Sequence, residues 1–222
     1  MYKDKCPKYT HNQEVHNTIT HLIGVAFALV VFSLILSYQI THNVPFGTMY
    51  PFYIYVFTMF VVFLMSSIYH SRPLDTKIRR ICRVIDHSDI YLFVAGTYTP
   101  ICILAIEHQG ISIGLLIVEY SLAVIGILVT IFGGLKYKAM EIIAYIIYLL
   151  DGWALMFVYP FNQCLHFLVF IFILVGGVVY TIGAITYAIG KKNIWFHTIF
   201  HIFIVIAAVI QFIGIWNIVI SL

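Results

Sequence analysis

The sequence predicts an all-α, polytopic membrane protein built as a bundle of seven transmembrane helices. Composition, the length of the apolar runs and the placement of the charges each point to this fold class. Of the 222 residues, 62% are hydrophobic and only 9% are charged, and the mean hydropathy is +1.00. A water-soluble domain of this size cannot bury so much apolar surface, so the lipid bilayer must act as its solvent.

Seven apolar runs are each long enough to cross a bilayer, which takes about 20 residues. We expect these helices over residues 18–40, 49–71, 84–106, 111–133, 139–160, 165–190 and 195–219. The first twenty residues are polar and differ from a cleavable signal peptide, and the links between the helices are short. The sequence therefore predicts a polar N-terminal segment over residues 1–17, followed by one membrane domain over residues 18–222.

The basic residues all fall on one side of this predicted bundle. The 12 Lys and Arg lie in the N-terminal segment or in the links after the second, fourth and sixth helices. The links 41–48, 107–110 and 161–164 contain none. By the positive-inside rule, the N-terminus is cytoplasmic and the C-terminus is outside. Seven-helix G-protein-coupled receptors have the opposite orientation, so that class is disfavoured.

Candidate metal ligands gather on the cytoplasmic side. His197 and His201 are one turn apart at the start of the last helix, where two imidazoles share a face and can grip one ion. His70 closes the second helix and Asp86 begins the third, at the same depth. Two histidines at a membrane interface could simply form hydrogen bonds to water. The additional candidate ligands His70 and Asp86 at the same depth favour a metal site instead. Three imidazoles with an open fourth position describe a catalytic zinc site.

Each of these residues has an expected role. His70, His197 and His201 would be neutral ligands of Zn²⁺, each needing a hydrogen-bond acceptor that sets its tautomer. Asp86 would hold or deprotonate a water molecule at the metal. Alternatively, Asp86 is an anion that complements the helix dipole. Ser66, one turn before His70, could orient the water or donate to an oxyanion, or could bond back to its own helix.

Four stretches carry motifs that occur together in one membrane protein family. They are Glu14–Gly24, Ser66–Ser71, Asp86–Pro100 and His197–His201. In these motifs and in the seven-helix layout, the chain resembles the hemolysin III group of the progestin and adipoQ receptor (PAQR) superfamily. The resemblance implies a zinc ion at His70, His197 and His201, with Asp86 and Ser66 near a water molecule at the metal.

The resemblance also implies a chemistry. The zinc geometry of related proteins is similar to that of membrane ceramidases, which implies hydrolysis of a lipid amide. Eukaryotic relatives act as hormone receptors, and bacterial relatives are named for the lysis of red cells. Asp89 and Asp151 depart from the family pattern, which has a small and an apolar residue at these places.

Three functions are left open by the sequence. The first is a zinc-dependent hydrolase of a membrane lipid amide or ester at the inner leaflet. The second is a lytic or pore-forming protein, although a channel lumen needs polar residues along several helices and none shows such a row. The third is a lipid-responsive receptor with structural zinc. We expect a membrane lipid as the partner, no nucleic acid, and a location in the plasma membrane.

Other polar residues support less specific expectations. Asp89, Glu119 and Asp151 lie within the expected helices, where they form either a polar path or neutral acids that join helices by hydrogen bonds. The second is favoured because no Lys or Arg lies within the helices to complete a relay. Cys102 and Cys164 both fall toward the outer face and could form a disulfide.

A polar stripe precedes or begins the first helix. Glu14, Asn17 and His21 share one helical face, and we expect them to support the metal site from beneath. Direct contact of His21 with the metal is the less favoured alternative.

Overall fold

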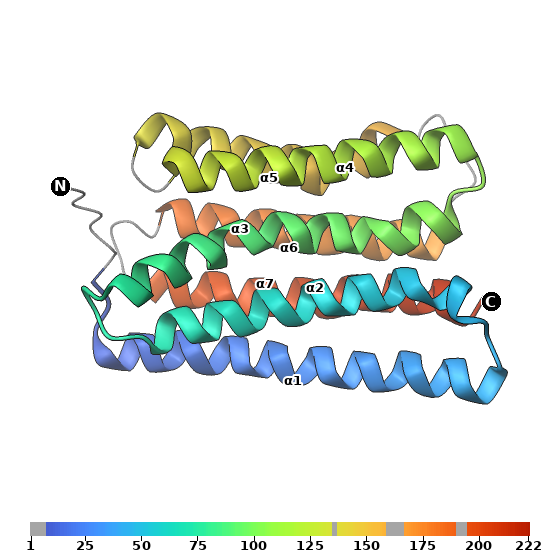
Figure 1. The fold of residues 1–222 in the computed structure, drawn as a ribbon, viewed down its shortest axis with the longest axis horizontal. Coiled ribbons are helices and arrows are strands. Elements are labelled where there is room, and N and C mark those ends of the chain that lie inside the picture. Colours follow the sequence, from blue (N-terminus) through green and yellow to red (C-terminus); the bar gives the residue numbers. More distant parts are fainter. Residues whose placement is uncertain (1–7, 135–136, 159–166, 190–194) are drawn as a thin grey trace.

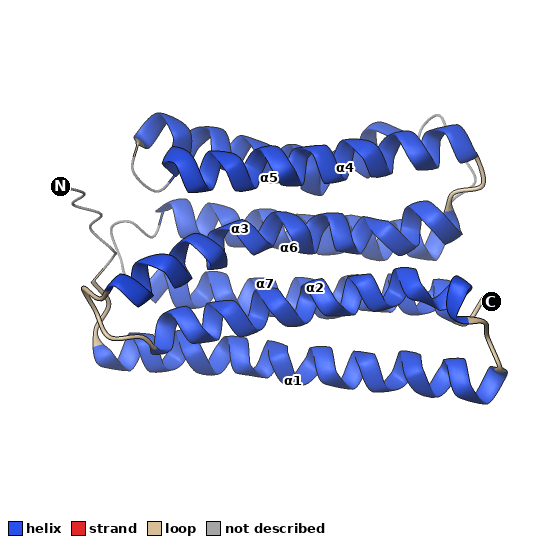
Figure 2. Ribbon diagram, viewed as in Figure 1, coloured by secondary structure: helices blue, strands red, loops and turns tan. Residues whose placement is uncertain are grey.

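The structure, a computed structural model, describes residues 8–134, 137–158, 167–189 and 195–222. These residues form helices and the turns between them (Figure 2). The helices are α1 (His11–His42), α2 (Phe46–Ser71), α3 (Lys77–Pro100), α4 (Gln109–Val129), α5 (Lys138–Val158), α6 (Phe167–Ile189) and α7 (Trp195–Val219). Within the described residues, seven helices are long and apolar enough to cross a membrane. The predicted all-α, seven-helix class is therefore confirmed.

Successive helices run antiparallel along the long axis of the molecule (Figure 1). Each of the first four helices packs against the next one, α6 packs closely against α7, and α1 also packs against α7. The starts of α1, α3, α5 and α7 and the ends of α2, α4 and α6 therefore meet at one end, which we call the N-terminal end of the bundle. Polar residues at this end come from sequence positions far apart.

Two helices begin earlier than hydropathy indicates. α1 starts at His11 rather than residue 18, and α3 starts at Lys77 rather than residue 84, so these two expected starts were wrong. At α1, the Thr10 hydroxyl accepts a bond from the Gln13 backbone, and the Gln13 side chain accepts one from the Thr10 N–H. Such a capping box sets where a helix begins, whereas hydropathy detects only the part that lies in hydrocarbon. α7 has the limits that were predicted.

Pro100 marks a change of helical geometry. The α-helical part of α3 ends there, and a short π-helical segment, η1 (Ile101–Ala105), continues the element. A second such segment, η2 (Thr130–Gly134), follows α4. Proline removes a backbone donor and crowds the preceding turn, which favours such irregular segments.

Close contact between α6 and α7 depends on two glycines. A Cβ atom at Gly176 would overlap Gln211 Cγ, and one at Gly183 would lie 3.0 Å from Phe203 Cβ. The two helices therefore approach each other more closely than larger residues would allow. This contact holds α7, and with it the histidine pair, against the rest of the bundle.

Candidate metal centre

The first two turns of α7 place two imidazoles side by side. His197 and His201 are both buried, with exposed fractions of 8% and 2%. Their Nε2 atoms lie 3.0 Å apart. The one-turn spacing in the sequence therefore brings both rings to one point, as predicted.

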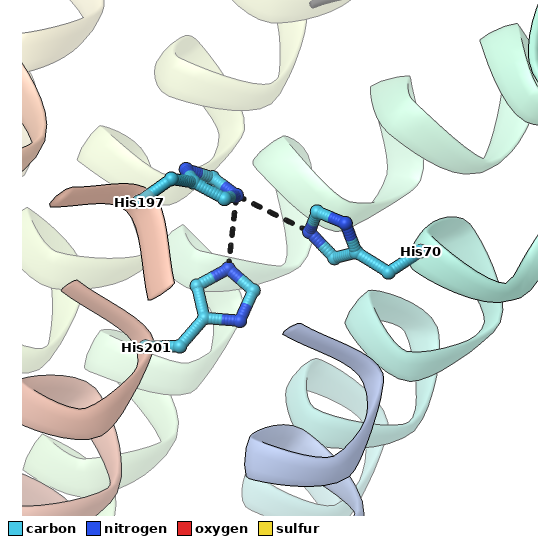
Figure 3. Close-up of side chains that lie close together, drawn as sticks. All are labelled: His70, His197 and His201. Atoms are coloured by element: carbon cyan, nitrogen blue, oxygen red, sulfur yellow. Dashed lines mark hydrogen bonds between the residues drawn. The ribbon is translucent and has the colours of Figure 1, made fainter. Parts of the chain in front are cut away.

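His70, in the last turn of α2, completes a cluster of three histidines. Its Nε2 atom lies 3.2 Å from Nε2 of His197, and its side chain is buried. Figure 3 shows the three rings pointing toward one another from α2 and α7. The ligand atoms of His70, His197 and His201 all lie within 4.8 Å of one another, and no other such metal-binding group occurs among the described residues.

Two of the three nitrogen–nitrogen distances in the cluster are close to those of a tetrahedral zinc site. With metal–nitrogen bonds of about 2.0–2.1 Å and tetrahedral angles, ligand nitrogens lie about 3.3 Å apart. Nε2 of His197 lies 3.2 Å from Nε2 of His70 and 3.0 Å from Nε2 of His201, close to that separation. The cluster thus supplies three ligands of the kind that Zn²⁺ prefers.

Hydrogen bonds on the far side of two rings fix which nitrogen faces the cluster. His70 Nδ1 donates to Glu14 Oε2 at 2.7 Å, and His201 Nδ1 donates to the Asn17 carbonyl at 3.3 Å. Both Nε2 atoms then carry lone pairs toward His197. A single N–H of His197 could satisfy only one of them well, which leaves an inward-facing lone pair that is able to coordinate a cation.

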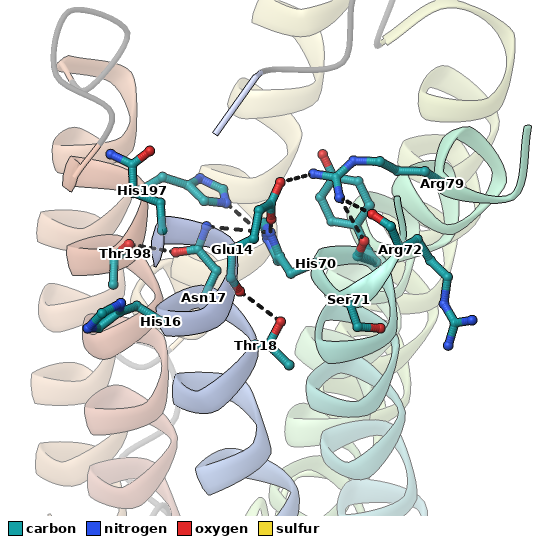
Figure 4. A network of polar contacts seen from close by, with 12 residues as sticks. Glu14, His16, Asn17, Thr18, His70, Ser71, Arg72, Arg79, His197 and Thr198 are labelled. Atoms are coloured by element: carbon teal, nitrogen blue, oxygen red, sulfur yellow. Dashed lines mark hydrogen bonds and ion pairs between the residues drawn. The ribbon is translucent and has the colours of Figure 1, made fainter. Parts of the chain in front are cut away.

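The carboxylate of Glu14 joins the histidine cluster to a buried arginine. Its second oxygen, Oε1, pairs with Nη2 of Arg79, whose side chain is only 1% exposed. Arg79 also donates to the carbonyls of Tyr69 and Arg72, at 3.3 and 2.7 Å. Figure 4 shows this network running from the arginine to His70. Sequence reasoning counted Arg79 only as a cytoplasmic charge, because it placed the start of α3 seven residues too late.

Asn17 connects α1 with α7 beside the same cluster. Its side-chain oxygen accepts a 2.6 Å bond from the Thr198 hydroxyl, and its side-chain nitrogen lies 3.4 Å from His70 Nδ1. Asn17 is fully buried. The polar stripe expected on the first helix therefore lies directly behind the three histidines, where its side chains can orient their rings.

His21 completes this stripe one turn farther along α1. Its ring packs against that of His201, with centroids 3.9 Å apart. It is buried, and neither ring nitrogen has a hydrogen-bond partner in the described part of the chain. The ring does not join the group of three ligand atoms.

Asp86 and Ser66 lie beside the histidines without joining the ligand group. Both are buried, and the Ser66 hydroxyl lies near the Asp86 carboxylate. The charge of Asp86 also acts on His197 and His201. Sequence reasoning assigned no role to His87, whose Nδ1 lies 3.2 Å from Asp86 Oδ2 but without the geometry of a hydrogen bond.

Tyr9, to which the sequence assigned no role, lies over the cluster. Its ring stacks on His197 with a centroid distance of 4.9 Å and an interplanar angle of 19°. It also lies 5.9 Å from the ring of His70. Burial, and then the nearby phenols of Tyr187 and Tyr69, raise the pKa of the Tyr9 phenol above its ordinary value. Tyr9 therefore stays protonated at neutral pH.

The remaining intramembrane acids lie apart from the ligand group. Glu119 on α4 and Asp151 on α5 have no exposed surface and interact with each other across the two helices. Their four carboxylate oxygens have no hydrogen-bond partner among the described residues, so the joining of helices by these acids stays a prediction. Asp89 is buried near Asp86. Cys102 is buried, and because its expected partner Cys164 lies outside the described residues, their disulfide stays a prediction.

Known proteins resemble this chain over most of its length. A family model described as "Haemolysin-III related" matches residues 9–212. A curated relative, "Hemolysin-3 homolog" of Bacillus subtilis (strain 168), is 31% identical over 197 residues, which is 88% of this chain and 89% of the relative. "Hemolysin-3" of Bacillus cereus is 29% identical over 201 residues, which is 90% of this chain and 89% of that protein.

Proposed function

Because this chain belongs to the haemolysin-III-related family, within the PAQR superfamily, we propose that it is a zinc-dependent hydrolase of membrane lipids. His70, His197 and His201 would hold one Zn²⁺, and the scissile bond would be a lipid amide or ester. The convergence of three buried imidazole nitrogens from two helices supports this proposal most directly. A bound zinc ion supplies Lewis acidity, which polarises a carbonyl group and acidifies water.

The neighbouring side chains fit the remaining steps of hydrolysis. Asp86 would accept the proton of the attacking water and return it to the leaving nitrogen or oxygen. The Ser66 hydroxyl, which lies near Asp86, would orient that carboxylate or donate to the developing oxyanion. Glu14 and the Asn17 carbonyl would keep the rings of His70 and His201 oriented through their Nδ1 atoms.

The depth of the cluster favours a lipid substrate at the inner leaflet. The three ligands lie within two turns of the ends of α2 and α7, which corresponds to the level of headgroups and acyl linkages rather than the bilayer centre. The placement of the 12 Lys and Arg supports a cytoplasmic N-terminus, and the proposed location is the plasma membrane. Thiol labelling of cysteines introduced at His42 and at Lys77 tests the orientation, because only the cysteine at position 77 should be reached from the cytoplasm.

Metal analysis combined with lipid turnover tests the enzymatic proposal. We expect the purified wild type to hold one zinc per chain and to release fatty acid from an amide or ester lipid. His197→Ala should lose both properties. Asp86→Asn should keep the metal and lose turnover. His42→Ala, a histidine change at the opposite end of α1, should change neither. Hydrolysis unaffected by His197→Ala or by Asp86→Asn would refute the proposal.

A receptor with structural zinc is the second candidate, favoured by the burial of the ligands. His70, His197 and His201 have exposed fractions of only 2–8%, as suits a metal that stabilises a fold. In that case, removal of zinc lowers the unfolding temperature, and no lipid is hydrolysed by the wild type or by any variant.

A further inference from the structure

One aromatic side chain covers the histidine cluster from outside the helical bundle. Tyr9 precedes α1, and its ring lies nearly parallel to that of His197. Its phenol also interacts with Tyr187 and Tyr69, which belong to α6 and α2. The ring therefore lies across the N-terminal end of the bundle, above the ligands contributed by α2 and α7.

The backbone next to this ring is anchored, whereas the ring is held by side-chain contacts alone. Thr10 follows Tyr9 directly and forms the capping box with Gln13, which is buried. The position of Tyr9 relative to the helix start is thus set. Rotation about its own side-chain bonds would move the ring off His197 without unfolding any helix, and such rotations are fast compared with helix movements.

Other rings around the cluster lack this freedom. The ring of Tyr69 lies 4.5 Å from that of His70, and the ring of Tyr187 lies 5.3 Å from that of His197. Both belong to packed helices, so their displacement requires repacking of the bundle. Tyr9 is the aromatic contact of the cluster that can leave at least cost among the described residues.

We propose that Tyr9 is a removable cover, whose ring must turn away before a metal ion or a chelator can reach His197 and His70 from the N-terminal end of the bundle. This inference rests on the metal binding proposed above. A cover differs from a ligand or a ligand support in its kinetic effect. It slows loading and release by the same factor and leaves the dissociation constant unchanged, because it alters the path and not the bound state.

The strength of the stacking contact sets the size of the expected effect. An aromatic pair contributes about 0.5–1.5 kcal/mol beyond the area it buries. With this contact, the histidine cluster is uncovered for a fraction of the time that is about two- to tenfold smaller than without it. Exchange of the metal should accelerate by that factor when the ring is removed.

Stopped-flow exchange with the purified full chain in lipid nanodiscs tests the cover. Zinc loading, zinc release to excess EDTA and the equilibrium dissociation constant are measured for the wild type and for Tyr9→Ala. We expect both rates to rise about two- to tenfold in Tyr9→Ala, with an unchanged dissociation constant. Tyr9→Phe keeps the ring and should exchange zinc at the wild-type rate. Tyr50→Ala, the same loss of a tyrosine near the start of α2 at the other end of the bundle, should also exchange at that rate.

Three outcomes would overturn the inference. Unchanged exchange rates in Tyr9→Ala would show that the ring does not limit access. A weaker dissociation constant with an unchanged loading rate would show that Tyr9 supports the bound metal instead. A wild type that binds no zinc would remove the proposed function together with the cover, whereas the first two outcomes remove only the cover. Tyr9→Leu, which keeps apolar bulk without a stacking face, provides the same comparison should Tyr9→Ala fail to accumulate.

Discussion

Replacing Glu14 with glutamine should damage both the stability of the bundle and its affinity for zinc. The carboxylate of Glu14 is the counter-ion of Arg79, and its other oxygen accepts the Nδ1–H bond of His70 at 2.7 Å. Glutamine keeps the size of the side chain and removes its charge. Arg79 is only 1% exposed and would keep its positive charge. Without the carboxylate of Glu14, its remaining partners would be carbonyl oxygens and the ring face of Tyr69, none of which carries a negative charge.

The expected magnitude follows from the burial of this pair. Breaking a buried ion pair by removal of one partner costs about 3–5 kcal/mol. At about 2–4 °C per kcal/mol for a chain of this length, the unfolding temperature should fall by about 6–20 °C. Loss of the acceptor behind a ligand histidine typically lowers metal affinity about 10- to 100-fold. Glutamine still offers a neutral oxygen to His70, so we expect the lower part of that range.

A double-mutant cycle with Arg79→Met separates the two effects. Thermal unfolding of metal-free protein should show a smaller loss from Glu14→Gln in the Arg79→Met background, because no buried guanidinium is then left unpaired. Zinc titration should show the same loss of affinity in both backgrounds. Glu107→Gln, at an exposed position in the link before α4, should change neither quantity. Equal loss of stability in both backgrounds would refute the role of Glu14 as counter-ion of Arg79, and unchanged zinc affinity would refute its role as the acceptor behind His70.

Three further predictions concern packing, the acid pair and the metal. Gly126→Ala on α4 should lower the free energy of unfolding by about 1–3 kcal/mol, because the new Cβ atom would overlap the ring of Tyr91. At Gly114 on the same helix, an added Cβ atom would meet nothing within 4 Å. Gly114→Ala should therefore be neutral or slightly stabilising. Asp151→Leu should lower the free energy of unfolding by about 1–3 kcal/mol, because it leaves buried Glu119 unpaired. The double variant Glu119→Leu/Asp151→Leu should lose less stability in thermal unfolding than the two single variants together. Simple additivity would contradict the pairing of the two acids. Saturating zinc at about 100 times its dissociation constant should stabilise the wild type by about 2.7 kcal/mol in the same measurement, and an unchanged unfolding temperature would argue against specific binding.

Several features of the fold were predictable because they depend on local properties of the chain. Transfer of a long apolar run into hydrocarbon is a sum over its own residues, so the seven spans follow from the sequence, and α7 has the predicted limits. The approach of His197 and His201 is equally local, because the helix itself sets the distance between residues one turn apart. The early starts of α1 and α3 escaped prediction, since capping by Thr10 and Thr76 carries no hydropathy signal.

The sequence by itself determined the membrane class and one imidazole pair, and it supplied candidates for the rest of the site. Only the tertiary structure decided that His70 meets that pair, that Glu14 lies between His70 and a buried Arg79, and that Tyr9 covers the cluster. The physical reason is that hydropathy gives the depth of a residue in the bilayer but not the rotation of its helix about the long axis. That rotation depends on side-chain packing between helices far apart in the sequence, such as α1 against α2 and α7.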